Sequence, residues 1–156
     1  GVLQVDGLPV GKSLGKYYLK ELLADNPAGS IIIILATDAP LSDRNLTRLA
    51  RRSFAGLART GASFNDGSGD YALAFSTAES VRRTPERRRQ LSPTSELPNA
   101  LISPLFQAAI EATEEAIYIS LCMATPLTGY QGHRAEALPL DQVRAMYQNS
   151  NQADLI

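Results

Sequence analysis

The dipeptide Gly29-Ser30 joins a glycine carbonyl to a serine that heads an apolar run. Glycine has no Cβ, so its backbone takes conformations closed to other residues and leaves its carbonyl open to the serine hydroxyl. Attack by that hydroxyl would give an ester, and hydrolysis of the ester would free the Ser30 amine. An α-amine has a reference pKa of about 7.7–8.0, so it can act as base for the neighbouring hydroxyl. A Gly-Ser pair before a strand is common, however, so this pair alone favours a plain strand start.

The other motifs and reactive residues in the sequence are better explained as ordinary structural features. The stretch 7–13 resembles a phosphate loop but has three residues between its glycines where the motif needs four, which favours a β-turn. The acidic stretch 66–70 lacks the further oxygen ligands of a calcium loop, so no metal is expected. His133 is the only histidine and is predicted to lie in a loop, which favours a surface or interface position. Cys122 falls in an apolar helical stretch and is predicted to be a small core residue.

Length and composition are those of one globular domain with a core: 156 residues, of which 44% are hydrophobic. The net charge of −1 gives no reason to expect nucleic acid or an anionic membrane as partner. A single cysteine rules out an internal disulfide, so cytoplasmic and periplasmic locations both stay open. No apolar run reaches 18 residues, which argues against a membrane span. The chain begins Gly1-Val2-Leu3 without a Met, which indicates a fragment or a processed chain.

The first half of the chain predicts a strand, a helix and a second strand. A turn at 25–29 precedes residues 30–37, where four isoleucines in a row predict a strand buried on both faces. Ser42 is a suitable N-cap for a helix through residue 58, with Gly61 as its stop. Residues 70–77 alternate well enough to predict a second strand.

The remaining segments predict helices joined by polar loops. Residues 17–24 can form a short helix, and the basic, proline-containing stretch 78–98 is expected to be a solvated surface loop or a subunit contact. A long apolar helix is predicted over 100–124, a loop over 129–133 and a terminal helix over 139–149. The order of strand, helix, strand and two helices implies a layered α/β or α+β domain.

Sequence blocks along nearly the whole chain resemble one protein family, the most specific being the run from Gly29 to Leu41. The matching blocks are residues 6–11, 29–41, 48–52, 67–70, 73–77, 105–109, 111–117, 128–133 and 137–139. They resemble the DmpA-type L-aminopeptidase/D-amidase-esterases and β-peptidyl aminopeptidases, peptidase family S58. The resemblance implies an αββα sandwich like that of N-terminal-nucleophile hydrolases, with a connectivity shared with ornithine acetyltransferases.

The resemblance also implies a precursor that cleaves itself between Gly29 and Ser30. Residues 1–29 would then be the C-terminal tail of an α subunit, and residues 30–156 a β subunit. Carried over by position, Ser30 matches the nucleophile, Ser68 the second active-site serine and Asp70 the acidic residue beside it. Ser68 and Asp70 are two positions apart, so in an extended stretch their side chains share one face. Asp70 could then orient the Ser68 hydroxyl for proton transfer with Ser30; the alternative is a glycine-rich hairpin with a capping Asp.

The expected function is therefore a serine aminopeptidase or amidase that works through an acyl-enzyme on Ser30. It needs no cofactor, and its partners are a peptide, amide or ester substrate, the α-subunit remainder and further αβ units in an oligomer. Two alternatives stay open: an acyltransferase of the ornithine acetyltransferase type, although those enzymes have threonine at the nucleophile position, and a non-enzymatic assembly or binding domain. The family's Asn-containing segment after Gly-Val-Leu, a source of an oxyanion-hole amide, is lacking here, where Leu3 runs directly into Gln4.

Overall fold

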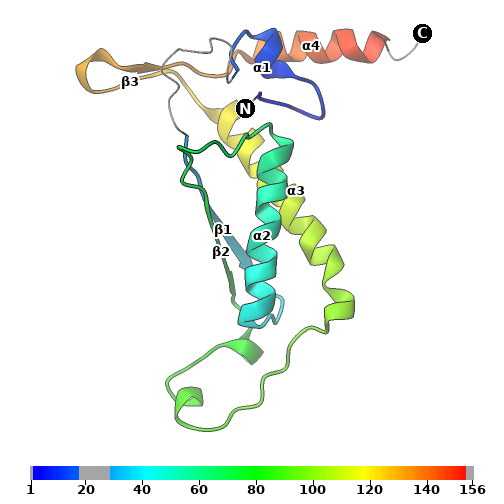
Figure 1. Ribbon diagram of the computed structural model, residues 1–156, viewed down its shortest axis with the longest axis vertical. Helices are drawn as coiled ribbons and strands as arrows, with labels where there is room; N and C mark the ends of the chain where they lie inside the picture. The colour runs from blue at the N-terminus through cyan, green and yellow to red at the C-terminus, as the bar shows by residue number, and fades with distance from the viewer. Residues whose placement is uncertain (1, 18–28, 154–156) are drawn as a thin grey trace. The chain divides into compact units, whose positions relative to one another are not determined.

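The computed structural model describes residues 2–17 and 29–153, drawn as ribbon in Figure 1. The chain forms two compact units. The sheet unit comprises Pro27–Ala58 and Phe64–Thr113, and the terminal unit comprises Gly1–Asn26, Arg59–Ser63 and Glu114–Ile156. The predicted helix at 17–24 falls, except for Tyr17, outside the described residues.

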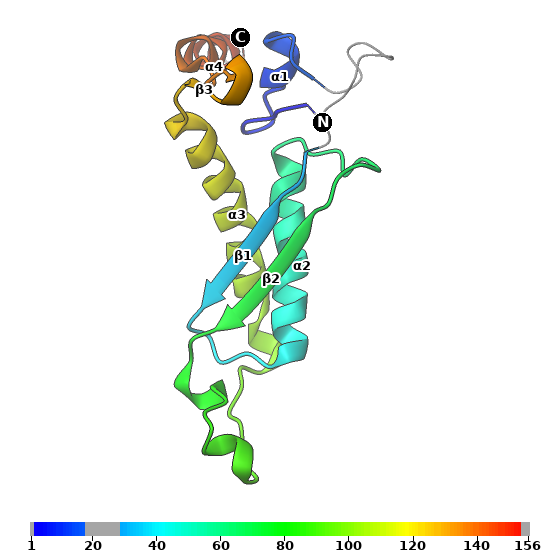
Figure 2. The ribbon, with the colours of Figure 1, turned by 90° about the vertical axis from the view of Figure 1, so that its left-hand side faces the viewer.

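The sheet unit is built on two parallel strands joined by a helix. Strand β1 (Ile32–Thr37) pairs in parallel with β2 (Tyr71–Ser76), with Ile32 opposite Tyr71 and Thr37 opposite Ser76. Parallel neighbours need a crossover connection, and α2 (Asp43–Arg59) supplies it. Figure 2 shows the strands side by side with α2 behind them. The predicted order of strand, helix and strand is confirmed.

Helix α2 begins and ends at residues whose chemistry suits those positions. The Ser42 carbonyl accepts the Leu46 N–H at 2.8 Å, and the Asp43 carboxylate lies in the first turn, where the helix dipole favours negative charge. Beyond the helix, Gly61 has a φ of +96°, and a Cβ there would collide with the carbonyl of Val2. Only glycine fits both conditions, so the predicted stop at Gly61 is confirmed.

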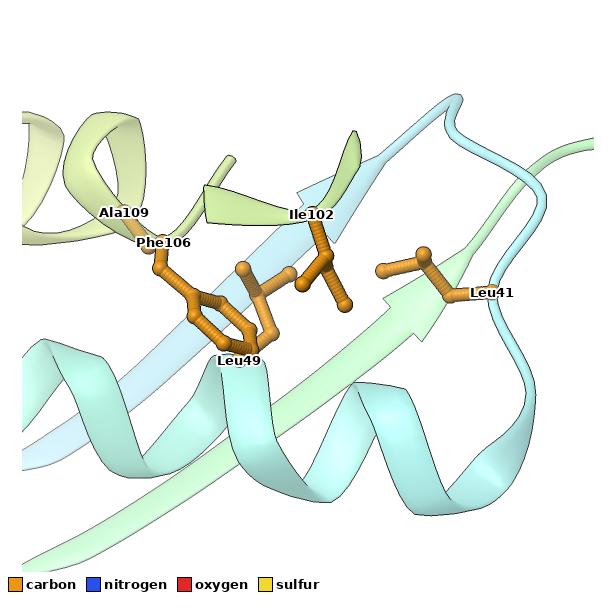
Figure 3. Close-up of a cluster of buried hydrophobic side chains, with 5 residues drawn as sticks. All are labelled: Leu41, Leu49, Ile102, Phe106 and Ala109. Atoms are coloured by element: carbon orange, nitrogen blue, oxygen red, sulfur yellow. The ribbon is translucent and has the colours of Figure 1, made fainter. Parts of the chain in front are cut away.

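The core of the sheet unit lies between the strands, α2 and the start of α3 (Ser103–Met123). Figure 3 shows its five buried side chains pointing toward one another. The Phe106 ring also carries the guanidinium groups of Arg48 and Arg52, at 5.0 and 4.5 Å from its centroid. The five buried residues are Leu41, Leu49, Ile102, Phe106 and Ala109.

Within the described residues only one face of the β1–β2 sheet is covered, so the prediction of a strand buried on both faces is wrong here. Ile33 points toward the helices and is 8% exposed, whereas Ile32 and Ile34 on the other face are 72% and 64% exposed. Tyr71, Leu73 and Phe75 of β2 are exposed as well. In Figure 2 no described element crosses in front of this face. The error arose because a run of isoleucines fits either situation: the sequence of a strand does not say whether a second layer is present.

The stretch 78–98 is a surface loop, as predicted, with two short 3-10 turns at Glu79–Val81 and Arg87–Arg89. The Arg87 guanidinium donates to the carbonyl oxygens of Glu79 and Arg82, which ties the two turns together. A third turn, Asn99–Leu101, precedes α3, and Asn99 accepts hydrogen bonds from Asn45 and Arg48 on α2.

The terminal unit begins with a β-turn in which Val5 and Leu8 exchange backbone hydrogen bonds of 3.1 and 2.9 Å. The one-turn helix α1 (Val10–Ser13) follows, so the phosphate-loop likeness belongs to a turn and a short helix. Strands β3 (Leu127–Thr128) and β4 (Arg134–Ala135) form a short hairpin around the predicted loop. The terminal helix α4 (Leu140–Ala153) confirms the last predicted element.

Cys122 is exposed, so its prediction as a core residue is wrong. It lies on α3 beside Ile119 and Met123, which are exposed as well. An apolar helix face is buried only where another element packs on it, and within the described residues none covers this one. None of the helices in the described part of the chain is both long and apolar enough for a membrane crossing.

Candidate active site

Ser30 and Gly69 lie side by side because the two parallel strands start in register. Each stands two residues before a paired strand position, Ile32 opposite Tyr71. The Tyr71 N–H donates to the Ile31 carbonyl at 2.9 Å and so extends the pairing toward the site. The Gly69 N–H donates to Ser30 Oγ at 3.0 Å. The sheet therefore holds the serine hydroxyl against a backbone donor at its amino-terminal edge.

Ser68 lies between the Gly29 carbonyl and the Asp70 carboxylate. Its Oγ is 2.7 Å from Gly29 O and 2.8 Å from each of Asp70 Oδ1 and Oδ2. A hydroxyl has one proton, so it can donate either to the carbonyl or to the carboxylate at one time. Donation to Gly29 O polarises the carbonyl next to Ser30, and donation to Asp70 connects the serine to a proton acceptor. The predicted sharing of one face by Ser68 and Asp70 is thus found in the structure.

A turn preceding β2 positions Ser68. The Ser68 N–H donates to the Asn65 carbonyl at 2.9 Å, and Phe64 just before the turn has a φ of +48°. Gly29 and Ser30 are exposed, whereas Ser68 and Asp70 are half-buried. In this chain the site is therefore open to solvent on the serine side and backed by the sheet unit on the other.

The remaining candidates from the sequence belong to other elements of the chain. His133 is an exposed residue of the β3–β4 hairpin, and its backbone carbonyl accepts the Gly129 N–H at 2.7 Å. Among the described residues, no three His, Cys, Asp or Glu side chains gather closely enough to hold a metal ion. The segment after Val2 forms backbone hydrogen bonds within the terminal unit, where the Gln4 N–H donates to Thr60 O at 3.0 Å.

Sequence reasoning missed Gly69, whose contribution is a backbone N–H. Side-chain patterns do not reveal backbone donors, so in the sequence Gly69 is distinguished only as part of a glycine-rich stretch. One signal could have found it. Once β1 and β2 are taken as parallel neighbours with Ile32 opposite Tyr71, position 69 falls opposite Ser30.

Comparison with known proteins gives close likenesses along most of the chain. It is 38% identical over 155 residues to β-peptidyl aminopeptidase BapA of Sphingosinicella microcystinivorans, covering 92% of this chain and 39% of that protein. The PH0078 protein of Pyrococcus horikoshii OT3 superposes with a TM-score of 0.80 at 40% identity, over 95% of this chain and 39% of its own. The chain thus spans about two fifths of the length of the relatives it matches.

A third similar protein indicates the type of fold. The L-aminopeptidase D-Ala-esterase/amidase of Ochrobactrum anthropi, described as a variant of the Ntn hydrolase fold, has a TM-score of 0.80 at 29% identity over 96% of this chain and 40% of its own. The expected α/β fold of N-terminal-nucleophile-hydrolase type is therefore confirmed. Residues 1–135 match the sequence profile of peptidase family S58. The chain therefore belongs to peptidase family S58.

Proposed function

We propose that this chain carries the nucleophile of a self-processing serine aminopeptidase or amidase, with Ser30 as nucleophile after cleavage of the Gly29–Ser30 bond. The observation that carries the proposal is the 2.7 Å contact between Ser68 Oγ and Gly29 O, next to a Ser30 hydroxyl held by Gly69. A donor on the carbonyl and a positioned hydroxyl beside it both favour an acyl shift.

In the cleavage step, Ser30 Oγ attacks the Gly29 carbonyl carbon. Negative charge develops on Gly29 O, where the Ser68 hydroxyl donates. The carbon–nitrogen bond then breaks, the proton released from Oγ goes to the departing Ser30 nitrogen, and an ester remains on Oγ. Water hydrolyses the ester and leaves a carboxylate on Gly29 and a free amine on Ser30.

In turnover, the Ser30 amine takes the hydroxyl proton while Oγ attacks the carbonyl of a substrate's N-terminal residue. The resulting ammonium gives its proton to the leaving amine or alcohol, and an acyl-enzyme forms. Water then attacks the acyl carbon, one of its protons passes through the Ser30 amine to Oγ, and the acyl group departs as a carboxylic acid. Asp70, 2.8 Å from Ser68 Oγ, anchors the second serine through these transfers.

The substrate class follows from the relatives, which are named as a β-peptidyl aminopeptidase and as an L-aminopeptidase D-Ala-esterase/amidase. The proposed substrates are peptides, amides or esters with a free N-terminal residue. On this proposal residues 1–29 end the α subunit and residues 30–156 form the β subunit. The working unit is an αβ pair, assembled into an oligomer.

Intact-mass measurement and N-terminal sequencing of the complete protein test the proposal. We expect a fragment that begins at Ser30 in the active preparation, and an uncut, inactive protein for Ser30→Ala. Ser63→Ala, which removes an exposed loop serine, is the matched control and should process normally. An uncut chain in an active preparation would contradict the proposal. Acetyl transfer from acetyl-ornithine to glutamate, assayed in parallel, would favour the acyltransferase alternative.

A further inference from the structure

The backbone N–H of Gly69 is the only donor that the described residues direct at the oxygen of Ser30. Its nitrogen lies 3.0 Å from Ser30 Oγ, while Ser68 and Asp70 on either side face the Gly29 carbonyl and each other. A hydroxyl that accepts this bond must turn its own proton away from Gly69. The contact therefore restrains the position of Oγ and keeps its proton on the sides away from Gly69.

We infer that the Gly69 N–H is a catalytic donor to the nucleophilic oxygen, in self-cleavage and in turnover alike. The inference rests on the proposed function. As Ser30 loses its proton, negative charge grows on Oγ, and a donor already in place stabilises it without reorganisation. When the acyl-enzyme is hydrolysed, the bond from the acyl carbon to Oγ breaks and Oγ again carries charge until it is reprotonated. The same donor then stabilises a leaving oxygen.

This role differs from that of an oxyanion donor, which acts on the carbonyl oxygen. In the uncleaved chain Ser68 faces the carbonyl oxygen of Gly29, and Gly69 faces the attacking oxygen of Ser30. The two donors are adjacent in sequence, so one extended segment serves both reacting atoms. Loss of the Gly69 donor should therefore slow each step in which Oγ carries charge, including the hydrolysis of an ester substrate.

The absence of a side chain at position 69 keeps space open beside the nucleophile. A Cβ there would lie 3.4 Å from Ser30 Oγ and 3.7 Å from Cε2 of Tyr71. Those are ordinary contact distances, so Gly69→Ala should fold and retain its N–H. Its methyl group would fill the space between the serine oxygen and the tyrosine ring. The alanine variant thus crowds the space beside Ser30 Oγ while keeping the N–H donor, so its effect can be compared with that of removing the donor.

The decisive experiment replaces Gly69 by glycolic acid in the complete protein, which changes one amide to an ester and removes only the N–H. We expect self-cleavage, acylation and deacylation to slow by about tenfold to a hundredfold each, as for a hydrogen bond to a charged group. Circular dichroism and melting temperature should stay close to those of the control. The matched control carries glycolic acid at Gly67, an exposed turn glycine in the same stretch.

Suppose that the unmodified protein is cut before Ser30. If the Gly69 ester protein then cleaves itself, acylates and deacylates as fast as the Gly67 control, the inference is overturned and the proposed function stands. If the unmodified protein is active without a cut before Ser30, the proposed function is contradicted. Should the ester protein not fold, ¹⁵N-glycine NMR decides. The Gly69 amide proton should move upfield in Ser30→Ala, which cannot cleave itself, relative to freshly prepared, still uncut Ser68→Ala, in which self-cleavage is slowed. An unchanged Gly69 resonance would overturn the inference.

Discussion

Ser68 Oγ has three oxygen neighbours within 2.8 Å and a single proton to share among them. While the proton points to Asp70, the Gly29 carbonyl is not activated. While it points to Gly29, the proposed acyl shift at Ser30 would be assisted. On this proposal the carboxylate competes for the same proton that activates the carbonyl, and the rate of self-cleavage should depend on how often Ser68 faces Gly29.

Removal of this hydroxyl should leave folding intact and slow self-cleavage. For Ser68→Ala we expect a decrease of about a hundredfold to a thousandfold, the usual effect of losing one donor to a developing oxyanion. Time-resolved gel analysis of the complete protein measures the rate. Ser68→Thr keeps a hydroxyl and should recover a large part of it, whereas equal loss in both variants would indicate a purely structural serine.

For single residues of the candidate site, the sequence predicted the arrangement of the side chains but not the contribution of a backbone N–H. Ser68 and Asp70 could be placed on one face of an extended stretch from their spacing, and the structure brings Ser68 to the Gly29 carbonyl and Asp70 to Ser68. Gly69 could not be recognised, because its contribution depends on which residue lies opposite it in the sheet. Cys122 was misplaced for a related reason: a helix pattern marks an apolar face without saying what covers it.

Helix α2 links the sheet to the core through Leu49, which is buried against Ile102 and Phe106. Leu49→Ala should lower the free energy of unfolding by about 2–5 kcal/mol, because the cavity it leaves closes only partly. Leu91→Ala, at a fully exposed position of the 78–98 loop, should change it by less than about 0.5 kcal/mol. Urea denaturation followed by circular dichroism measures both. Equal effects at the two positions would mean that this cluster is not the stabilising core.

Helix α3 carries a tyrosine that should make stability sensitive to alkaline pH. Burial, and then the hydrogen bond to the Glu114 carboxylate at 3.0 Å, raise the pKa of Tyr118 to about 12. An unfolded tyrosine titrates near pH 10. The folded state therefore holds the proton more tightly, and the stabilisation is complete below about pH 10 and is lost as the pH rises toward 12.

The corresponding variant is Tyr118→Phe, which cannot ionise. Its free energy of unfolding should fall less steeply with pH above 10 than that of the unmodified protein. A smaller fall should persist, because burial and the charge of Asp6 also raise the pKa of Tyr147. Denaturant titrations between pH 8 and pH 11 measure the two slopes. If the free energy of unfolding fell equally steeply with pH in both proteins, Tyr118 would not be the cause of the pH dependence.

The longer elements, β1, α2, β2, α3 and α4, followed from the sequence because each has a local signal, whereas α1 and the β3–β4 pairing were not predicted. The N-cap at Ser42, the stop at Gly61 and the apolar length of α3 act within a few residues of the boundary they set. The covering of the β1–β2 sheet has no local signal, because four isoleucines in succession lack the alternation that marks a half-exposed strand. The number of layers depends on residues elsewhere in the folded protein.

At the scale of the whole molecule, the exposed sheet face is the feature that a self-contained domain would not be expected to have. Ile32, Ile34, Tyr71, Leu73 and Phe75 form a continuous apolar surface on the side of the sheet away from the helices. Surfaces of this kind on a soluble protein are commonly contact surfaces. In a two-sheet sandwich such a face packs on a second sheet about 10 Å away. The chain matches only about two fifths of the length of its relatives. We propose that the part of the complete protein outside these 156 residues supplies the second sheet.

This proposal predicts that one substitution has opposite effects in two contexts. An exposed apolar face favours self-association, so we expect the 156-residue chain alone to associate through it. Ile34→Lys places a charge on that face and should reduce this association while leaving the fold intact. In the complete protein the same lysine would be buried without a partner, and it should lower the free energy of unfolding by about 1–3 kcal/mol or more. Ile33→Lys, on the buried face, should destabilise both forms. Sedimentation velocity and thermal melts measure these effects, and an Ile34→Lys that is harmless in the complete protein would place the second sheet elsewhere.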